Sequence, residues 1–261
     1  MKKSTLLLAL AASVLISSCT KSLNLNNEGD ASVCDSIRVN RISGNLTVPV
    51  GGSTTLSVRD FSVVNDFVYI NWWGPNNYSD QGHRSIDLNN VNLTTAGWYY
   101  VRMSSMNRGC EKIDSVFVNV TMPQGTPPCN LAVNIISYSN MGTSPIMGTS
   151  KTFNTLNLKV LRASSATGST ELQFNAYWRD REPVDGVYEV TTNPVQNDNY
   201  TNQIHISSIA QSIYFQGNTD GQKIYISHVN GKLQAQFCNI SMGGNNGQSW
   251  NTAISGTLRE Q

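Results

Sequence analysis

The stretch TTAGWYYVRM, residues 94–103, places three aromatic residues in a row, Trp98, Tyr99 and Tyr100, within a run that is typical of a β-strand. Successive side chains of a strand point to opposite faces, so the three rings cannot share one core. Val101 follows in phase with Tyr99. We therefore expect Tyr99 to be buried, while Trp98 and Tyr100 point away from the core.

Six further runs of this kind lie in the first half of the chain, separated by Gly, Asn, Pro and Ser residues. Seven short strands over about 90 residues is the number expected of an immunoglobulin-like sandwich. Trp72 follows Ile70 in phase, so we expect it to point inward from a central strand. Gly97 and Tyr99 stand where a tyrosine corner opens a later strand of this fold.

Residues 32–122 contain several motifs that occur in the same order in a known class of protein module. They are Gly52 with Leu56 and Val58, Trp72-Trp73-Gly74-Pro75, Ala96-Gly97-Trp98-Tyr99, and Gly109-Cys110 followed by Val116, Val118 and Val120. In these motifs the region resembles the immunoglobulin-like and PKD-like modules of bacterial surface and secreted proteins. The resemblance implies a β-sandwich but no particular activity. Leu56 and Val101 occupy the positions of the intersheet cysteines of vertebrate domains, so the module must rely on packing inside.

The same alternation predicts an exposed aromatic surface. On three strands that are neighbours in one sheet of such a sandwich, the outward side chains include five aromatic rings and an arginine. We call this set the aromatic face, and it consists of Tyr69, Trp73, Trp98, Tyr100, Arg102 and Phe117. Such a patch usually has a partner, and these residue types anchor sugar and protein ligands. We expect a glycan, another protein or the second domain of the same chain to cover it.

The N-terminus has the features of an export signal. Two lysines precede an apolar run at residues 6–16 that is too short to span a bilayer. Residues 16–19, Ile-Ser-Ser-Cys, resemble the lipobox of bacterial lipoproteins, which implies a signal peptide over residues 1–18 and a lipid-modified Cys19 that holds the protein at a membrane. Aspartate after the cysteine would favour the inner membrane, so Thr20 favours the outer membrane. Residues 19–31 are predicted to form a flexible tether. An ordinary signal peptide is the alternative.

Four cysteines remain after Cys19, an even number that suits an oxidising compartment. Four cysteines allow three pairings. A domain boundary at residues 123–128 favours Cys34 with Cys110 and Cys129 with Cys238, because each disulfide then closes one domain. No CxxC or close Cys/His spacing indicates zinc, so we expect no metal and no cofactor.

Proline and glycine interrupt the β pattern in residues 123–128 and predict a linker. Alternating runs resume in residues 129–261, where Asn230-Gly231 predicts a hairpin turn. We therefore predict an all-β protein, with an immunoglobulin-like sandwich over residues 32–122 followed by a second antiparallel β-sandwich or barrel-like domain. A barrel would allow a small apolar ligand inside.

Catalytic groups are sparse in this sequence. It contains no HExxH, GxSxG or Gly-rich phosphate loop, and strand alternation predicts a solvated His205. Acidic residues cluster once, at Asp180, Glu182 and Asp185. Two carboxylates could serve a glycoside hydrolase, or the cluster could keep a turn soluble. We expect no enzymatic activity and no catalytic residue, with a carbohydrate-active hydrolase as the alternative.

The charge balance bears on possible partners. Charged residues are 13% of the chain and the formal net charge is +1, so removal of Lys2 and Lys3 with a signal peptide would leave +1 − 2 = −1. This balance favours neither nucleic acid nor anionic lipid as a partner. The sequence predicts an outer-membrane-anchored binding or adhesion module for a glycan or envelope protein. A structural component of an envelope complex is a further alternative.

Overall fold

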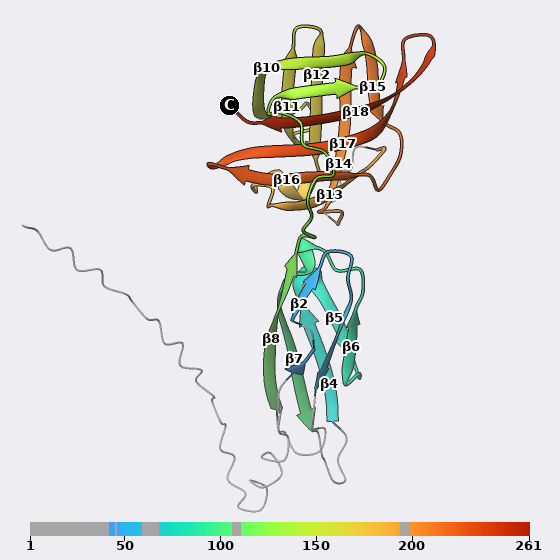
Figure 1. The fold of residues 1–261 in the computed structure, drawn as a ribbon. Coiled ribbons are helices and arrows are strands. Elements are labelled where there is room, and N and C mark those ends of the chain that lie inside the picture. The colour runs from blue at the N-terminus through green and yellow to red at the C-terminus, as the bar shows by residue number, and fades with distance from the viewer. Residues whose placement is uncertain (1–41, 45, 59–67, 106–110, 194–198) are drawn as a thin grey trace, which may run out of the picture.

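The computed structural model describes residues 42–44, 46–58, 68–105, 111–193 and 199–261. Cys19, Cys34 and Cys110 lie outside the described residues, as do the predicted signal peptide and tether. Strands make up 62% of the structure and the described residues form no α-helix, so the all-β prediction is confirmed. Figure 1 shows two β-rich bodies that meet where β8 (Glu111–Thr121) leads into the second.

Two sheets form the N-terminal sandwich. Their other strands are β1 (Ile42–Ser43), β2 (Thr47–Pro49), β3 (Thr54–Val58), β4 (Val68–Gly74), β5 (Tyr78–Gln81), β6 (Ser85–Leu88) and β7 (Gly97–Ser105). The smaller sheet has the order β1-β3-β6 and the larger has the order β2-β8-β7-β4-β5. β2 and β8 are parallel, whereas β4, β7 and β8 pair antiparallel. These three strands are therefore neighbours in one sheet, as expected of an immunoglobulin-like sandwich.

Alternating side chains fill the space between the two sheets. Leu56, Trp72 and Val101 are fully buried, so apolar packing occupies the place of an intersheet disulfide. Tyr99 is also buried, and its Oη donates a hydrogen bond to the Thr95 carbonyl at 3.0 Å. This contact is the tyrosine corner, and it ties the start of β7 to the loop that precedes it.

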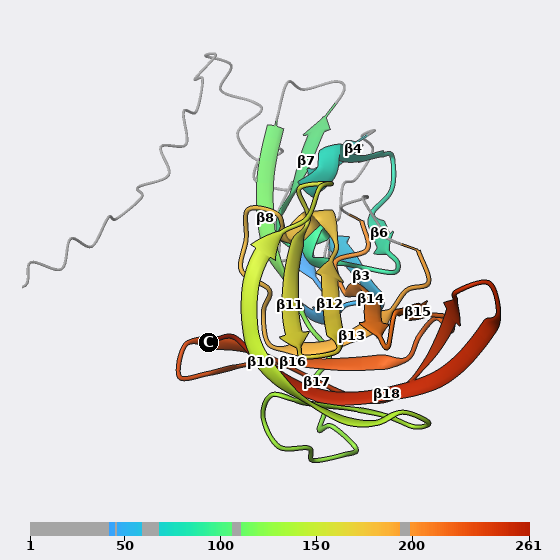
Figure 2. The same ribbon diagram turned by 90° about the horizontal axis from the view of Figure 1, so that it is seen from above.

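The second body is built from one ten-stranded sheet. Its strands are β9 (Ile135–Tyr138), β10 (Gly142–Phe153), β11 (Lys159–Ser165), β12 (Gly168–Phe174), β13 (Gly186–Val190), β14 (Gln203–Ala210), β15 (Ile213–Gly217), β16 (Lys223–Val229), β17 (Lys232–Asn245) and β18 (Ser249–Arg259). The order β12-β11-β10-β9-β18-β17-β15-β14 returns from β14 to β12, which closes the sheet. β13 and β16 form a second bridge between β14 and β17. Figure 2 shows the long β10, β17 and β18 curving around this barrel-like body.

Large side chains fill the interior of the closed sheet. Phe174, Trp178, Tyr188, Phe215 and Phe237 all belong to one hydrophobic core and are almost completely buried. The rings of Phe174 and Tyr188 meet edge to face, with centroids 6.0 Å apart. The interior of this closed sheet is therefore a packed core. A ligand-binding barrel instead keeps an open cavity in this position.

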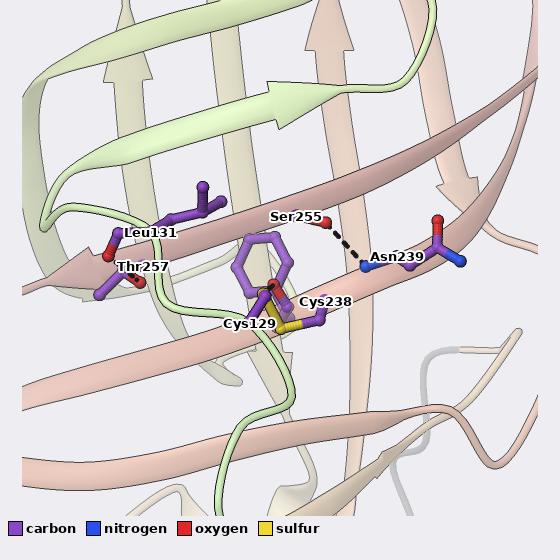
Figure 3. The surroundings of a disulfide bond; sticks show 7 residues. Cys129, Leu131, Cys238, Asn239, Ser255 and Thr257 are labelled. Atoms are coloured by element: carbon purple, nitrogen blue, oxygen red, sulfur yellow. Dashed lines mark hydrogen bonds between the residues drawn. A yellow bond between two sulfur atoms is a disulfide. The ribbon is translucent and has the colours of Figure 1, made fainter.

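A disulfide joins Cys129 to Cys238, as predicted, and fastens the chain that leaves the linker to β17 (Figure 3). The register between β17 and β18 shifts at this point, so the bonded cysteine lies in a β-bulge. Asn239 follows it with a φ of +55°, a backbone conformation that asparagine tolerates well. Its backbone N–H donates to Ser255 Oγ at 2.8 Å, which gives the bulge a partner outside the ladder.

The N-terminal sandwich and the barrel-like body, which we call the second sandwich, touch directly. Val50 and Leu93 of the first sandwich pack against the core of the second, and Met122, which we placed in the first domain, is buried in the second core. The Pro123 carbonyl accepts a hydrogen bond from the β13 backbone at 2.7 Å, and the Leu93 N–H donates to Thr201 Oγ1 at 3.3 Å. The start of the segment that follows β8 is thus hydrogen-bonded to the second sandwich.

Two predictions for the second half have opposite outcomes. Asn230-Gly231 turns between β16 and β17 with φ values of +53° and +75°, so the hairpin is confirmed. The prediction of a solvated His205 is wrong, because the side chain is buried and its Nδ1 lies 3.0 Å from the Thr191 carbonyl. Thr191 directly follows β13, which pairs in parallel with β14 and so brings this segment over the histidine.

Candidate binding face

Strand register places the rings of the aromatic face in cross-strand pairs. Trp73 on β4 lies opposite Tyr100 on β7, and the two rings stack with centroids 5.4 Å apart and an interplanar angle of 11°. Trp98 on β7 lies opposite Phe117 on β8, with centroids 5.5 Å apart and an angle of 72°. Such pairs contribute about 0.5 to 1.5 kcal/mol beyond the area they bury. The face is therefore held in one arrangement before any partner arrives.

Three rings of the face are open to solvent. Tyr69, Trp98 and Phe117 are 41%, 52% and 45% exposed, whereas Trp73 and Tyr100 are half-buried by their mutual stacking. Tyr69 is the second residue of β4, and its Oη donates a hydrogen bond to Gln81 Oε1 on the edge strand β5 at 2.5 Å. The described residues thus leave an apolar, aromatic sheet face uncovered.

The sequence pattern did not identify two neighbours of the aromatic face. Ile113 on β8 lies opposite Arg102 on β7 and is 56% exposed, which makes it the most open apolar side chain of this sheet. Glu111 lies beyond it, and its carboxylate binds the Arg102 guanidinium at 3.1 Å. Ile113 is in phase with Phe117, so the alternation that identified Phe117 could have found it too.

The second sandwich does not cover the aromatic face. The contact between the sandwiches is made at one end of the first, by Val50, Leu93 and Met122. Trp98 and Phe117 keep their exposure with the whole second sandwich in place. The possibility that this face is buried against the second domain is therefore wrong for the described part of the chain.

The carboxylates of the acidic cluster lie beside basic side chains. Asp185 Oδ1 lies 2.6 Å from His228 Nδ1, and Glu182 Oε1 lies 3.6 Å from His228 Nε2. Glu182 Oε1 is also 2.6 Å from Lys151 Nζ. Asp180 lies exposed on the turn that follows β12 and the short 3-10 helix after it. The structure therefore brings two of the three carboxylates together around a histidine and leaves the third at the surface.

The ion pairs keep Glu182 negatively charged. Partial burial opposes ionisation, but the hydrogen bond and charge of Lys151, the charge of Lys159 and the proximity of His228 together lower the pKa of Glu182 below its ordinary value of 4.5. Lys159 is itself buried and donates to the Arg181 carbonyl. The general acid of a glycoside hydrolase needs a raised pKa. This cluster has the electrostatics of a structural ion-pair network.

The described residues contain no group of three or more His, Cys, Asp and Glu side chains placed to hold a metal ion. Among these residues, no helix has the length and apolar character needed to cross a membrane. Comparison with protein-family models and with curated proteins gives no match to this chain.

Proposed function

We propose that this protein is a non-enzymatic, lipid-anchored outer-membrane protein whose aromatic face binds another protein of the cell envelope. The observation that supports this proposal is the exposure of Tyr69, Trp98 and Phe117 while the second sandwich is attached. Covering a large apolar side chain completely is worth about 1.5 to 3 kcal/mol. Three half-open rings on one rigid sheet face therefore give a partner a substantial driving force for association.

A protein suits this face better than a glycan does. Sugars bind aromatic residues by stacking on a free ring face, but Trp73 and Tyr100 already stack on each other. Around the rings lie Ile113, which is exposed, and Arg102, whose guanidinium is half exposed beside Glu111. Tryptophan, tyrosine and arginine at the centre of a patch are the residues that dominate binding energy in protein interfaces.

The anchor is part of the same proposal. Cys19 follows an apolar segment with a lipobox-like ending, and an acylated cysteine there would hold both sandwiches near a membrane surface. Metabolic labelling with palmitate tests this part, since the label should appear in the native chain and disappear in Cys19→Ala. Labelling that persists in the variant would contradict the assignment of Cys19.

Site-specific photo-crosslinking in intact cells that naturally make the protein tests the binding face. A benzophenone amino acid replaces Phe117 in one variant and Tyr214 in the control. Tyr214 is a suitable control because it is 49% exposed on the second sandwich, close to the 45% of Phe117. We expect a discrete protein adduct from position 117 only, and we expect Trp98→Ala to reduce it.

The outcomes separate the possible occupants of the face. An adduct whose mass is that of the chain plus a second protein supports the proposal, and an adduct of twice the chain mass identifies a second copy as the partner. No protein adduct from position 117, or equal adducts from positions 117 and 214, would contradict it. A carbohydrate in place of protein at position 117 would assign the face to a glycan instead.

A further inference from the structure

A cleft of about 550 Å³ lies where the two sandwiches meet. The first sandwich contributes loop residues 50–51 and 90–92, the linker contributes residues 123–125, and the second sandwich contributes β13, β16 and the segment that enters β14. This volume falls within the range of about 300 to 1,000 Å³ that small-ligand sites occupy, and junctions between domains are a common place for them. The cleft is distinct from the aromatic face.

The wall from the second sandwich carries both rings and charges. On the ladder of β13 and β16, Val187 lies opposite Tyr225 and Glu189 lies opposite Lys223, so all four side chains share the outward side. Glu189 and Lys223 form an ion pair with each other, and among the described residues no other charged side chain lines the cleft. Tyr200 adds a second ring that is 48% exposed. The described lining of the cleft therefore combines aromatic surface with one self-compensated ion pair.

Side-chain amides make up much of the remaining lining. Asn90 comes from the first sandwich, and Asn202 and Gln203 come from the second. Within the part of the chain that the structure describes, their amide groups make no hydrogen bond, whereas Gln124 Nε2 donates to the Met122 carbonyl at 3.1 Å. An amide offers both donors and an acceptor, so these three groups can bind hydroxyls in either role.

The walls of the cleft are joined by hydrogen bonds. The Leu93 N–H donates to Thr201 Oγ1 across the junction, and the Thr201 carbonyl accepts from Trp178 Nε1 at 2.7 Å in the second core. The linker lies against the cleft wall, because a Cβ on Gly125 would be only 3.2 Å from Tyr225 Cε1. A ligand would therefore meet a largely formed site, which lowers the entropy cost of binding.

We infer that this cleft binds a neutral oligosaccharide. A sugar ring has apolar faces that stack on tyrosine and a rim of hydroxyls that amides recognise. Among the described residues, the self-compensated pair of Glu189 and Lys223 leaves no excess charge for a phosphate or a carboxylate, and the abundance of amides disfavours a wholly apolar ligand. Tyr200 would stack on the sugar, with Gln203 and Asn202 binding its hydroxyls.

Saturation-transfer NMR and calorimetric titration of the purified full chain in detergent test this inference. The probes are cellotriose, mannotriose and maltotriose, with trigalacturonate as the charged comparison. We expect at least one neutral trisaccharide to bind, and trigalacturonate to bind more weakly. Tyr200→Ala should weaken binding about tenfold, the loss expected for one stacking ring. Tyr214→Ala is the matched control, since its exposure is 49% against 48% for Tyr200.

Circular dichroism and thermal unfolding establish that each variant keeps its fold, and Gln203→Ala provides a second, smaller perturbation in the same cleft. Binding that weakens in Tyr200→Ala and Gln203→Ala but not in Tyr214→Ala supports the inference. It would be overturned if none of the neutral trisaccharides bound, if trigalacturonate bound more tightly than all of them, or if binding were lost in Trp98→Ala and kept in Tyr200→Ala. The last result would place the sugar on the aromatic face.

Discussion

Replacing Tyr99 by phenylalanine removes the hydroxyl of a buried ring in the first sandwich and leaves the ring itself. The lost contact is the 3.0 Å hydrogen bond from Tyr99 Oη to the Thr95 carbonyl. The ring keeps its edge contact with Tyr78, at a centroid distance of 5.7 Å, and its fit against Gly74, where a Cβ would lie 2.6 Å from Tyr99 Cδ1. The substitution therefore tests the tyrosine corner separately from packing.

The expected loss is about 1 kcal/mol in the free energy of unfolding, the net value of one such hydrogen bond. It is not larger, because Thr95 is only half-buried and water can reach the region of its carbonyl. For a sandwich of this size, 1 kcal/mol corresponds to a decrease of about 4 to 8 °C in Tm. Tyr188→Phe is the matched variant in the second sandwich, where Tyr188 Oη donates to the Val184 carbonyl at 2.9 Å.

The pH dependence gives a second measurement on the same variant. Burial, and then the nearby Tyr78, raise the pKa of Tyr99 from 10.0 to about 12. Between these values the unfolded chain loses the proton while the folded chain keeps it, so the folded state loses stability as pH rises. This contribution is fully present below pH 10 and is absent in Tyr99→Phe. The difference in stability between the native chain and the variant should therefore shrink from pH 10 to pH 12.

Urea denaturation followed by tryptophan fluorescence, at pH 7 and across pH 10 to 12, measures both effects. The reasoning would be refuted if Tyr99→Phe changed the free energy of unfolding by less than about 0.3 kcal/mol, well under the typical value of such a bond. It would also be refuted if the difference between variant and native chain stayed constant over the alkaline range.

Three further predictions concern the second sandwich. Replacing Cys129 and Cys238 together by serine opens a loop with a sequence separation of 109 residues and should cost about 2 to 5 kcal/mol in urea denaturation, with intact mass before and after reduction confirming the bond. Gly256→Ala should cost about 1 to 3 kcal/mol, because its Cβ would lie 2.7 Å from the facing phenylalanine ring, whereas Gly148→Ala, which meets nothing closer than 4.0 Å, should change little. Glu182→Gln should lower the free energy of unfolding by about 1 kcal/mol at pH 7. Since the pKa of Glu182 is lowered, this loss should vanish as pH falls through that pKa. A loss that persists in acid would contradict the ion-pair network.

Local alternation was enough to predict much of the first sandwich. The period of two along residues 94–103 separated the buried Tyr99 from the exposed Trp98, and the structure shows the same separation. The buried Trp72 followed from the same argument, as did the placement of β4, β7 and β8 in one sheet. These features depend on neighbours in sequence and on one well-known arrangement of strands.

Features that depend on distant pairing could not be predicted in this way. The closure of the second sheet rests on β12 pairing with β14, and the burial of His205 rests on β13 lying parallel to β14. Neither pairing leaves a mark on local periodicity. Met122 continues the alternation of β8, and only the docking of the second sandwich shows that it belongs to the other core. The cleft has no sequence signature, because its lining comes from segments that are far apart in the chain.

Hydroxyl-radical footprinting measures whether the aromatic face is covered in the cell envelope. The measurement compares oxidation of Trp98 and Phe117 in the purified chain with oxidation in the native envelope, with Tyr214 as an internal reference of similar exposure. We predict that Trp98 and Phe117 react readily in the purified chain and are protected in the envelope, while Tyr214 reacts equally in both. Equal reaction of Trp98 in both settings, or protection already in the purified chain, would contradict a partner-binding face.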